Sequence, residues 1–226
     1  ATRGGRVTGR GLAGPSLPEE LAEMGYATQA FVTNPHLRAE AGFGQGFAAW
    51  HHDRHTRLPI TLWHHAEGIL RRLGAPWDAV VSTRDARVTA AAIRALSEPP
   101  AGARFTWVHL LGPHEYTRHG GSPDERRAAY DALAATASQQ VAAIAAAAPD
   151  AVLVVTSDHG ELLGEGGRWG HGQALVPELL RVPLAIRSEA PPGVVDDPVA
   201  LIDIKHAWLE AHAAPRLEPR GRLRVG

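Results

Sequence analysis

The sequence predicts an α/β fold in which helices flank a mostly parallel sheet. Two short apolar runs carry this prediction, Phe105 to Leu111 and Val152 to Val155. Both are rich in β-branched or aromatic residues, as expected for strands buried on both faces. Polar residues follow both runs, Thr156-Ser157-Asp158 directly and His114-Glu115 after Gly112-Pro113. Ligands of open α/β sheets collect at the carboxyl ends of the strands. We therefore expect one domain over residues 1–226, with a loop-like start at 1–16 and a flexible tail at 215–226.

The composition is that of an ordinary globular protein with one sizeable core, at 44% hydrophobic and 21% charged residues. A net charge of −1 gives no electrostatic reason to expect a nucleic acid or an anionic membrane surface as partner. No apolar run approaches the roughly 18 residues of a membrane span, and no signal peptide is visible. The absence of cysteine excludes disulfides, thiolate metal sites and a cysteine nucleophile within these residues.

The first half begins with a helix after Ser16, which is a plausible N-cap because Glu19 completes a capping box. A strand at Tyr26 to Val32 follows. Five histidines then fall between positions 51 and 65, namely His51, His52, His55, His64 and His65. The i, i+4 spacing of the first and third of these could hold a metal on one helical face, but we favour a polar, variable loop or surface helix near the mouth of the site.

Three further elements are expected before the central strand. The segment from Ile60 to Leu73 is predicted to be helical, and Pro76-Trp77 to begin a connection. Thr83 to Leu96 has apolar residues at helical spacing. A long helix begins after Ser122, with Pro123 at its first position and Glu125 completing a second capping box.

The central strand leads into the residues that suggest chemistry. Asp158 and His159 leave the strand together, and an anionic oxygen beside an imidazole suits a divalent cation. A glycine-rich loop at 164–167 is expected to be flexible, and His171 follows between two glycines. A helix-like segment at 174–180 and a strand at 182–186 complete this region.

The motifs SDHGE, GHG and ELLRVPL in this region resemble those of the sulfatase family, within the alkaline-phosphatase superfamily. Four other segments match the family in the same order along the chain. These are the helix and Gly25-Tyr26 strand, the Gly42 to Phe47 loop, the GPHEY segment at 112–116, and Val199 to Trp208 with Asp203. The resemblance implies an alkaline-phosphatase-like α/β domain that is incomplete at its N-terminus.

The resemblance also implies roles for particular residues. Asp158 and His159 would bind a divalent metal, with calcium preferred and manganese, zinc or magnesium as alternatives. His114 and His171 would act catalytically on the transferring oxygens or the leaving group. Asn34 and His36 would contact the substrate, a small-molecule or glycan sulfate ester. Many sulfatases have Gly-Lys where this chain has Thr33-Asn34, and Lys where it has His171.

These 226 residues do not contain the nucleophile that the sulfatase family uses. Sulfatases oxidise the Cys or Ser of a C/S-x-P-x-R motif to formylglycine, and no such motif is present. The prediction is therefore a metal-dependent sulfuric-ester hydrolase represented by the part after the nucleophile, and inactive alone because its acidic metal-binding pair is missing as well. Two alternatives stay open. One is a phosphodiesterase, phosphonate hydrolase or phosphoethanolamine-type transferase of the superfamily, and the other is a non-catalytic remnant. Relatives are often exported, but the sequence leaves compartment and oligomeric state open.

Overall fold

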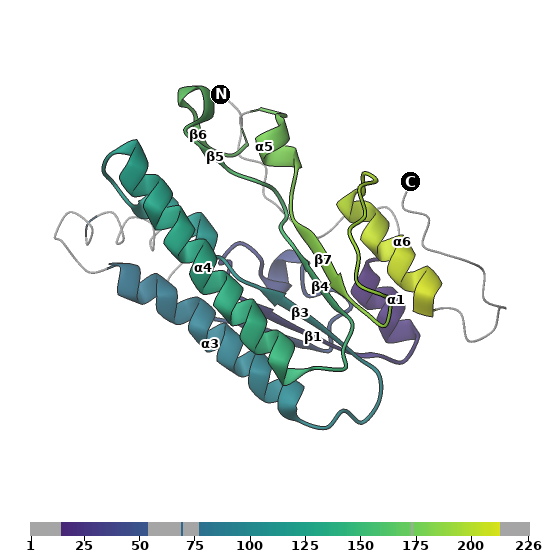
Figure 1. The fold of residues 1–226 in the computed structure, drawn as a ribbon. Coiled ribbons are helices and arrows are strands. Elements are labelled where there is room, and N and C mark those ends of the chain that lie inside the picture. Colours follow the sequence, from purple (N-terminus) through teal and green to yellow (C-terminus); the bar gives the residue numbers. More distant parts are fainter. Residues whose placement is uncertain (1–14, 54–68, 70–76, 173, 213–226) are drawn as a thin grey trace. The chain divides into compact units, whose positions relative to one another are not determined.

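The computed structural model describes residues 15–53, 69, 77–172 and 174–212 (Figure 1). The chain divides into two compact units, and each is described by itself. The first comprises Ala1–Asp150 and Leu163–Gly170, and the second Ala151–Leu162 and His171–Gly226. Several predictions fall outside the described residues: the loop at 1–14, the histidines at 55, 64 and 65, the helix expected at 60–73 apart from residue 69, and the tail at 215–226.

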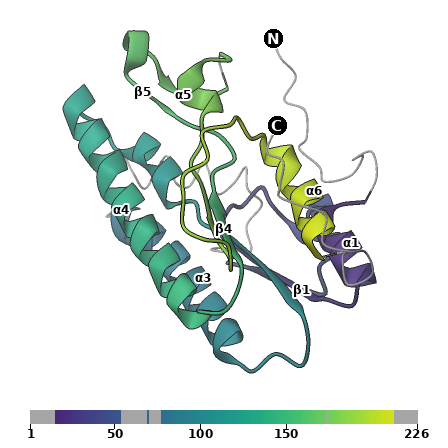
Figure 2. The same ribbon diagram turned by 45° about the vertical axis from the view of Figure 1, so that its right-hand side comes forward.

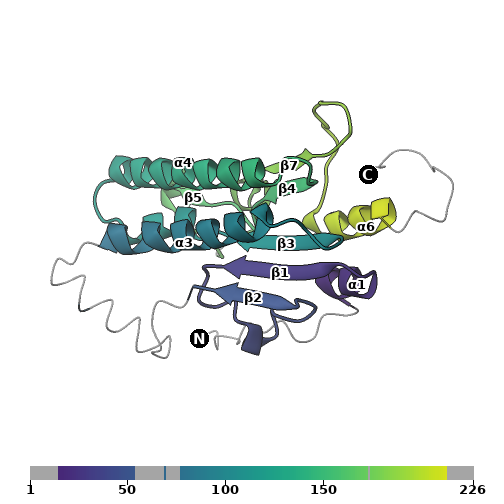
Figure 3. The same cartoon turned by 90° about the horizontal axis from the view of Figure 1, so that it is seen from below.

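Three parallel strands form the sheet of the first unit (Figure 3). β1 (Ala27–Val32) lies in the middle, between β2 (Ala49–His52) and β3 (Arg104–His109). Ala30 of β1 faces Trp50 on one side and Trp107 on the other. The small alanine leaves room for the two indole rings, whose centroids are 5.8 Å apart. The parallel pairing confirms the predicted parallel sheet, and β3 ends two residues earlier than the sequence suggested.

One face of this sheet is covered by the helix α3 (Trp77–Ser97). Phe31 of β1 packs with Val88 and Ala92 of α3, and all three side chains are at most 4% exposed. The expectation that Trp77 begins a connection is wrong, because the helix begins at that residue. No glycine or proline lies between Trp77 and the predicted start, so nothing in the sequence stops the helix from extending back to Pro76.

Polar side chains hydrogen-bond to the backbone in the helix before β1 and in the loop after it. α1 (Leu17–Glu23) begins with the predicted capping box, in which the Glu19 carboxylate accepts from the Ser16 N–H at 2.8 Å. The Thr28 hydroxyl donates to the carbonyl of Gly46 at 2.7 Å. Gly46 has a φ of +80°, and a Cβ there would meet the α1 backbone at 2.4 Å. Only glycine allows the loop to approach α1 this closely.

The helix α4 (Pro123–Ala147) runs beside α3 (Figure 1). Its predicted capping box is confirmed, with the Ser122 N–H donating to Glu125 at 2.7 Å. These hydrogen bonds from Ser122 lower the pKa of the Glu125 carboxyl. The 3₁₀ helix η2 (Gly112–Arg118) precedes α4 and packs against it. Among the described helices, none has both the length and the apolar character that crossing a membrane requires.

The second unit is built on two antiparallel strands, β4 (Leu153–Thr156) and β7 (Leu184–Arg187). Both strands were expected, but burial of the first on both faces was wrong. The residues of β4 are half-buried or exposed, and the preceding Val152 is 39% exposed. The apolar run shows that a strand forms, whereas its burial depends on which elements pack against it.

Short elements connect and follow these strands (Figure 2). β5 (Leu162–Leu163) and β6 (Trp169–Gly170) form a small hairpin, and η3 (Glu165–Gly167) lies in its turn. The glycine-rich loop expected at 164–167 contains this 3₁₀ turn. The helix expected at 174–180 is reduced to α5 (Pro177–Leu180), because Pro177 occupies its first position and fixes where it begins. α6 (Leu201–His212) follows, with the Asp203 carboxylate accepting from the N–H of Ala200 at 3.0 Å.

Candidate metal centre

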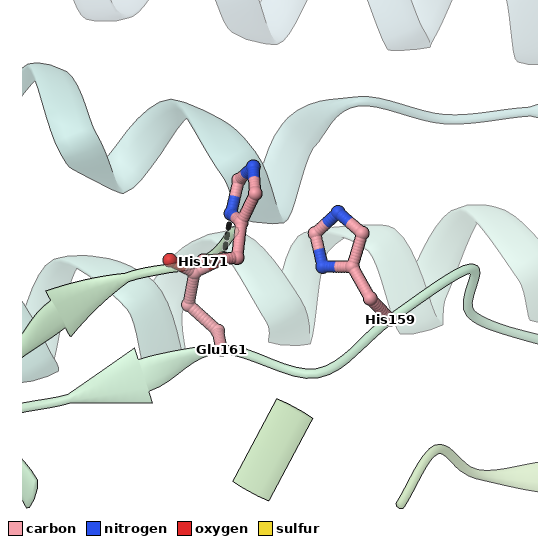
Figure 4. Close-up of side chains that lie close together, drawn as sticks. All are labelled: His159, Glu161 and His171. Atoms are coloured by element: carbon pink, nitrogen blue, oxygen red, sulfur yellow. Dashed lines mark hydrogen bonds and ion pairs between the residues drawn. The ribbon is translucent and has the colours of Figure 1, made fainter. Parts of the chain in front are cut away.

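Three side chains with metal-binding atoms come together in the second unit (Figure 4). His159 and Glu161 follow β4 and are separated by one residue, and His171 follows β6. Their nitrogen and oxygen atoms lie within 4.8 Å of one another. The two imidazole rings are adjacent, with centroids 4.1 Å apart. This is the one group of three or more such residues found in the described part of the chain.

The hydrogen bonds of the two imidazoles indicate which ring nitrogen carries the lone pair. His171 Nδ1 is 2.8 Å from a carboxylate oxygen of Glu161, and His159 Nδ1 is 2.8 Å from the carbonyl oxygen of Gly160. Carboxylate and carbonyl oxygens only accept, so each Nδ1 carries the proton. The lone pair of a neutral ring is then on Nε2. Histidines that bind metals are commonly oriented in this way, through a hydrogen bond from their other nitrogen.

Glu161 has the most buried side chain of the three residues. Its side chain is 8% exposed, compared with 31% for His171 and 40% for His159. A buried carboxylate needs a hydrogen-bonding partner or a cation, and His171 supplies the first. Sequence analysis did not assign Glu161 a role, although it lies in the SDHGE motif. The signal was its spacing of two from His159, because side chains two residues apart in extended backbone point the same way.

Asp158 lies beside this group rather than within it. Its side chain is 76% exposed, and one carboxylate oxygen is 3.8 Å from His159 Nε2. The other carboxylate oxygen accepts from the N–H of His159 at 3.1 Å. The predicted pair of Asp158 and His159 is thus adjacent, and its carboxylate lies close to the ring nitrogen that carries the lone pair.

The remaining predicted site residues belong to the first unit. Asn34 follows β1, and its side-chain oxygen accepts from the N–H of His36 at 2.9 Å, closing an Asx turn. Asn34 is half-buried and His36 is exposed. His114 lies on η2 with its side chain exposed. All three follow strands of the parallel sheet at their carboxyl ends, where the sequence placed them.

A buried carboxylate on α3 fixes the segment that carries His114. Asp85 is 4% exposed and accepts from the N–H groups of Leu111 and Gly112 at 3.1 and 2.7 Å. These are the residues at the start of η2. The neighbouring Arg84 is also buried, which lowers the pKa of its guanidinium, while the negative charge of Glu115 opposes that shift.

Replacing Asp85 by alanine is expected to loosen this segment and destabilise the protein by about 1–3 kcal/mol, because two largely buried N–H groups lose their acceptor. Urea unfolding measures the loss, and hydrogen exchange should quicken at the amides of Leu111 and Gly112. Asp85→Asn keeps one acceptor oxygen, so it should cost less. Equal stability of Asp85→Ala and the wild type would show that the carboxylate does not hold η2.

Comparison with known proteins identifies the family. The family model described as "Sulfatase" matches residues 2–212. The chain belongs to the sulfatase family. The fold is similar to that in the crystal structure of a candidate sulfatase from Bacteroides thetaiotaomicron, with a TM-score of 0.55 at 15% identity, over 77% of this chain and 46% of that one.

A short stretch also matches a protein from Haloferax volcanii named low-salt glycan biosynthesis sulfotransferase Agl7. The identity is 64% over 39 residues, which is 16% of this chain and 10% of that protein. The chain thus spans less than half of the solved structure, and the match to the named protein covers about a tenth of it.

Proposed function

We propose that this chain is part of the catalytic domain of a metal-dependent hydrolase of sulfuric esters. The observation that carries the proposal is the group of His159, Glu161 and His171 in a chain of the sulfatase family. Hydrolysis of a sulfate ester requires neutralisation of the non-bridging oxygens and a proton for the departing alkoxide. The carboxylate and the two imidazoles of this group offer ligands and proton donors for those tasks.

The donor set suits a divalent transition metal. Two imidazole nitrogens and the carboxylates of Asp158 and Glu161 match the ligands that zinc and manganese accept. Calcium, preferred from the family resemblance, takes six to eight oxygen ligands. We therefore rank manganese and zinc ahead of calcium. Asp158, His159 and His171 would hold the ion, which supplies positive charge to the ester oxygens, and Glu161 would either bind it as well or orient His171.

The residues of the chain have separate tasks in this proposal. The bond between His171 Nδ1 and Glu161 keeps the imidazole in one tautomer and one orientation. His114, exposed on η2, would donate a proton or a hydrogen bond to the leaving group. Asn34 and His36 would contact the ester. The nucleophile would come from outside residues 1–226, which contain no C/S-x-P-x-R motif. Alone, the chain should therefore be inactive.

The substrate class has two candidates. The short match to a protein named for glycan biosynthesis favours a sulfated glycan over a smaller ester. A phosphodiester or phosphonate is the second candidate, because the imidazole of His171 stands where many sulfatases have lysine. Two histidines at one metal suit a zinc-dependent phosphoryl-transfer enzyme as well as they suit a sulfatase.

The test uses the protein that the complete gene encodes, assayed with 4-nitrophenyl sulfate and bis(4-nitrophenyl) phosphate. We expect faster hydrolysis of the sulfate, abolished by EDTA and restored by Mn²⁺. Faster hydrolysis of the phosphodiester would instead indicate that the substrate is a phosphodiester or phosphonate. Failure of the metal-loaded protein to hydrolyse either ester would indicate a non-catalytic remnant.

A further inference from the structure

The hairpin between Glu161 and His171 determines how these two side chains meet. Its strands β5 and β6 contain two residues each. The N–H of Gly164 donates to the carbonyl of Arg168 at 2.9 Å across the turn. Counting outward from that pair, Leu163 faces Trp169, Leu162 faces Gly170, and Glu161 faces His171. The side-chain hydrogen bond between Glu161 and His171 therefore lies one position beyond the two strands of the hairpin.

A hairpin with strands this short is stable only when other elements of the protein pack against it. Two-stranded hairpins are at best marginally stable in water even when their strands are longer. His171 also lies between Gly170 and Gly172, whose φ angles of +88° and +83° favour glycine and leave the local backbone unusually free. Neither the hairpin nor the backbone of His171 therefore fixes the imidazole by itself.

The support comes from two arginines in the first turns of α4. Arg127 Nε donates to the carbonyl of Leu163 at 2.8 Å, and its guanidinium carbon is 5.9 Å from the centroid of the Trp169 ring. The guanidinium carbon of Arg126 is 5.4 Å from the same ring. Tyr116, 2% exposed, packs nearby with its ring centroid 6.4 Å from that of Trp169. All of these residues belong to the first unit.

Arg127 and Trp169 both lie very close to the backbone of Gly164 in the turn of the hairpin. A Cβ at Gly164 would lie 2.8 Å from Arg127 Nη2 and 3.2 Å from the ring of Trp169. Its φ of +110° is likewise a conformation that other residues rarely adopt. Glycine at this position therefore allows the arginine and the indole to approach the turn of the hairpin.

We propose that Arg126, Arg127 and Trp169 form a clamp that positions Glu161 and His171 for metal binding. The clamp holds both strands of the hairpin, Leu163 of β5 by a hydrogen bond and Trp169 of β6 through its ring. The chain continues directly from these strands into Glu161 on one side and His171 on the other. The three clamp residues are positioning residues and do not themselves bind the ion. This inference rests on the proposed metal centre.

The alternative is that the clamp merely packs the hairpin, with no effect on the ligands. The positioning role predicts that a change of Arg127 weakens metal binding, whereas the packing role predicts no effect on metal binding. Arg127→Met keeps much of the length of the side chain and removes the charge and the donor. Arg127→Lys keeps the charge and loses the planar group that bonds Leu163 and stacks on Trp169. Arg94→Met is the matched control, because Arg94 is exposed on the neighbouring α3.

The test measures Mn²⁺ affinity by isothermal titration calorimetry on the 226-residue chain and its variants. We expect Arg127→Met and Arg127→Lys each to weaken binding about tenfold, as for the loss of other groups that orient metal ligands, and Arg94→Met to have no effect. In a His171→Ala background, Arg127→Met should cause no further loss, because the ligand that the clamp positions is already gone.

Unchanged affinity in both Arg127 variants would overturn the clamp, and so would an equal loss with and without His171. Absence of Mn²⁺ binding by the wild type would instead overturn the metal centre on which this inference rests, whereas the proposed function is tested separately by hydrolysis of the two esters. The melting temperatures of the variants identify any that fail to fold. Of the two Arg127 variants, the one that folds decides the outcome.

Discussion

His171→Ala is expected to weaken Mn²⁺ or Zn²⁺ binding by at least about 100-fold, since loss of mere supporting groups around metal ligands already costs about 10- to 100-fold. The substitution removes an imidazole nitrogen from the proposed metal centre. It also removes the N–H that donates to Glu161, a carboxylate only 8% exposed. Calorimetric titration of the 226-residue chain measures the change. His206→Ala is the matched control, because His206 is exposed on α6 of the same unit.

Glu161→Gln separates two roles for the carboxylate. If Glu161 only orients His171, glutamine can still accept the hydrogen bond, and the affinity should fall about tenfold or less. If Glu161 binds the ion directly, the loss should approach that of His171→Ala. Equal affinity of His171→Ala and His206→Ala would remove His171 from the metal centre.

Gly160→Ala is the second substitution for which we expect a large effect. Gly160 separates His159 from Glu161, and its N–H donates to the carbonyl of Leu179 at 2.9 Å. A Cβ at this position would lie 2.0 Å from the carbonyl oxygen of Glu178 and 3.2 Å from the Cα of Leu179. These are backbone atoms, so no side-chain rotation relieves the clash, and either α5 or the segment carrying the ligands must move.

The expected result is a destabilisation of about 1–3 kcal/mol, the usual cost of overpacking, together with weaker Mn²⁺ binding because His159 and Glu161 are displaced. Thermal unfolding and calorimetry measure the two effects. Gly193→Ala is the control, since a Cβ there meets nothing within 4 Å and no positive φ is involved. If Gly160→Ala bound Mn²⁺ like the wild type, the close approach of α5 would not determine the ligand geometry.

Local signals predicted the elements of the fold well. The capping boxes at Ser16 and Ser122 give the starts of α1 and α4 within a residue. Proline and glycine mark most of the ends, because their effect on the backbone is local. The apolar runs at 105–111 and 152–155 each contain a strand. These features depend on neighbours within a few positions, which a single sequence records.

Pairing and burial were harder to predict, because they depend on residues far apart in the chain. The antiparallel pairing of β4 with β7 joins Leu153 to Arg187 and leaves β4 half-buried. Nothing in the run of valines distinguishes that arrangement from a strand covered on both faces. The same limit applied to the site. His159 and His171 were predicted from their motifs. Glu161 was missed although its spacing of two from His159 was a signal, because its contact with His171 depends on a hairpin pairing that the sequence does not display.

The most direct test of a centre built on His159 and His171 is pulsed electron paramagnetic resonance of the chain loaded with one equivalent of Mn²⁺. Electron spin echo modulation detects imidazole nitrogen bound to the ion. The proposed centre predicts coupling to two imidazole nitrogens, with one lost in His159→Ala and one in His171→Ala. A spectrum without nitrogen coupling would contradict it, because the ion would then be bound by oxygen atoms alone.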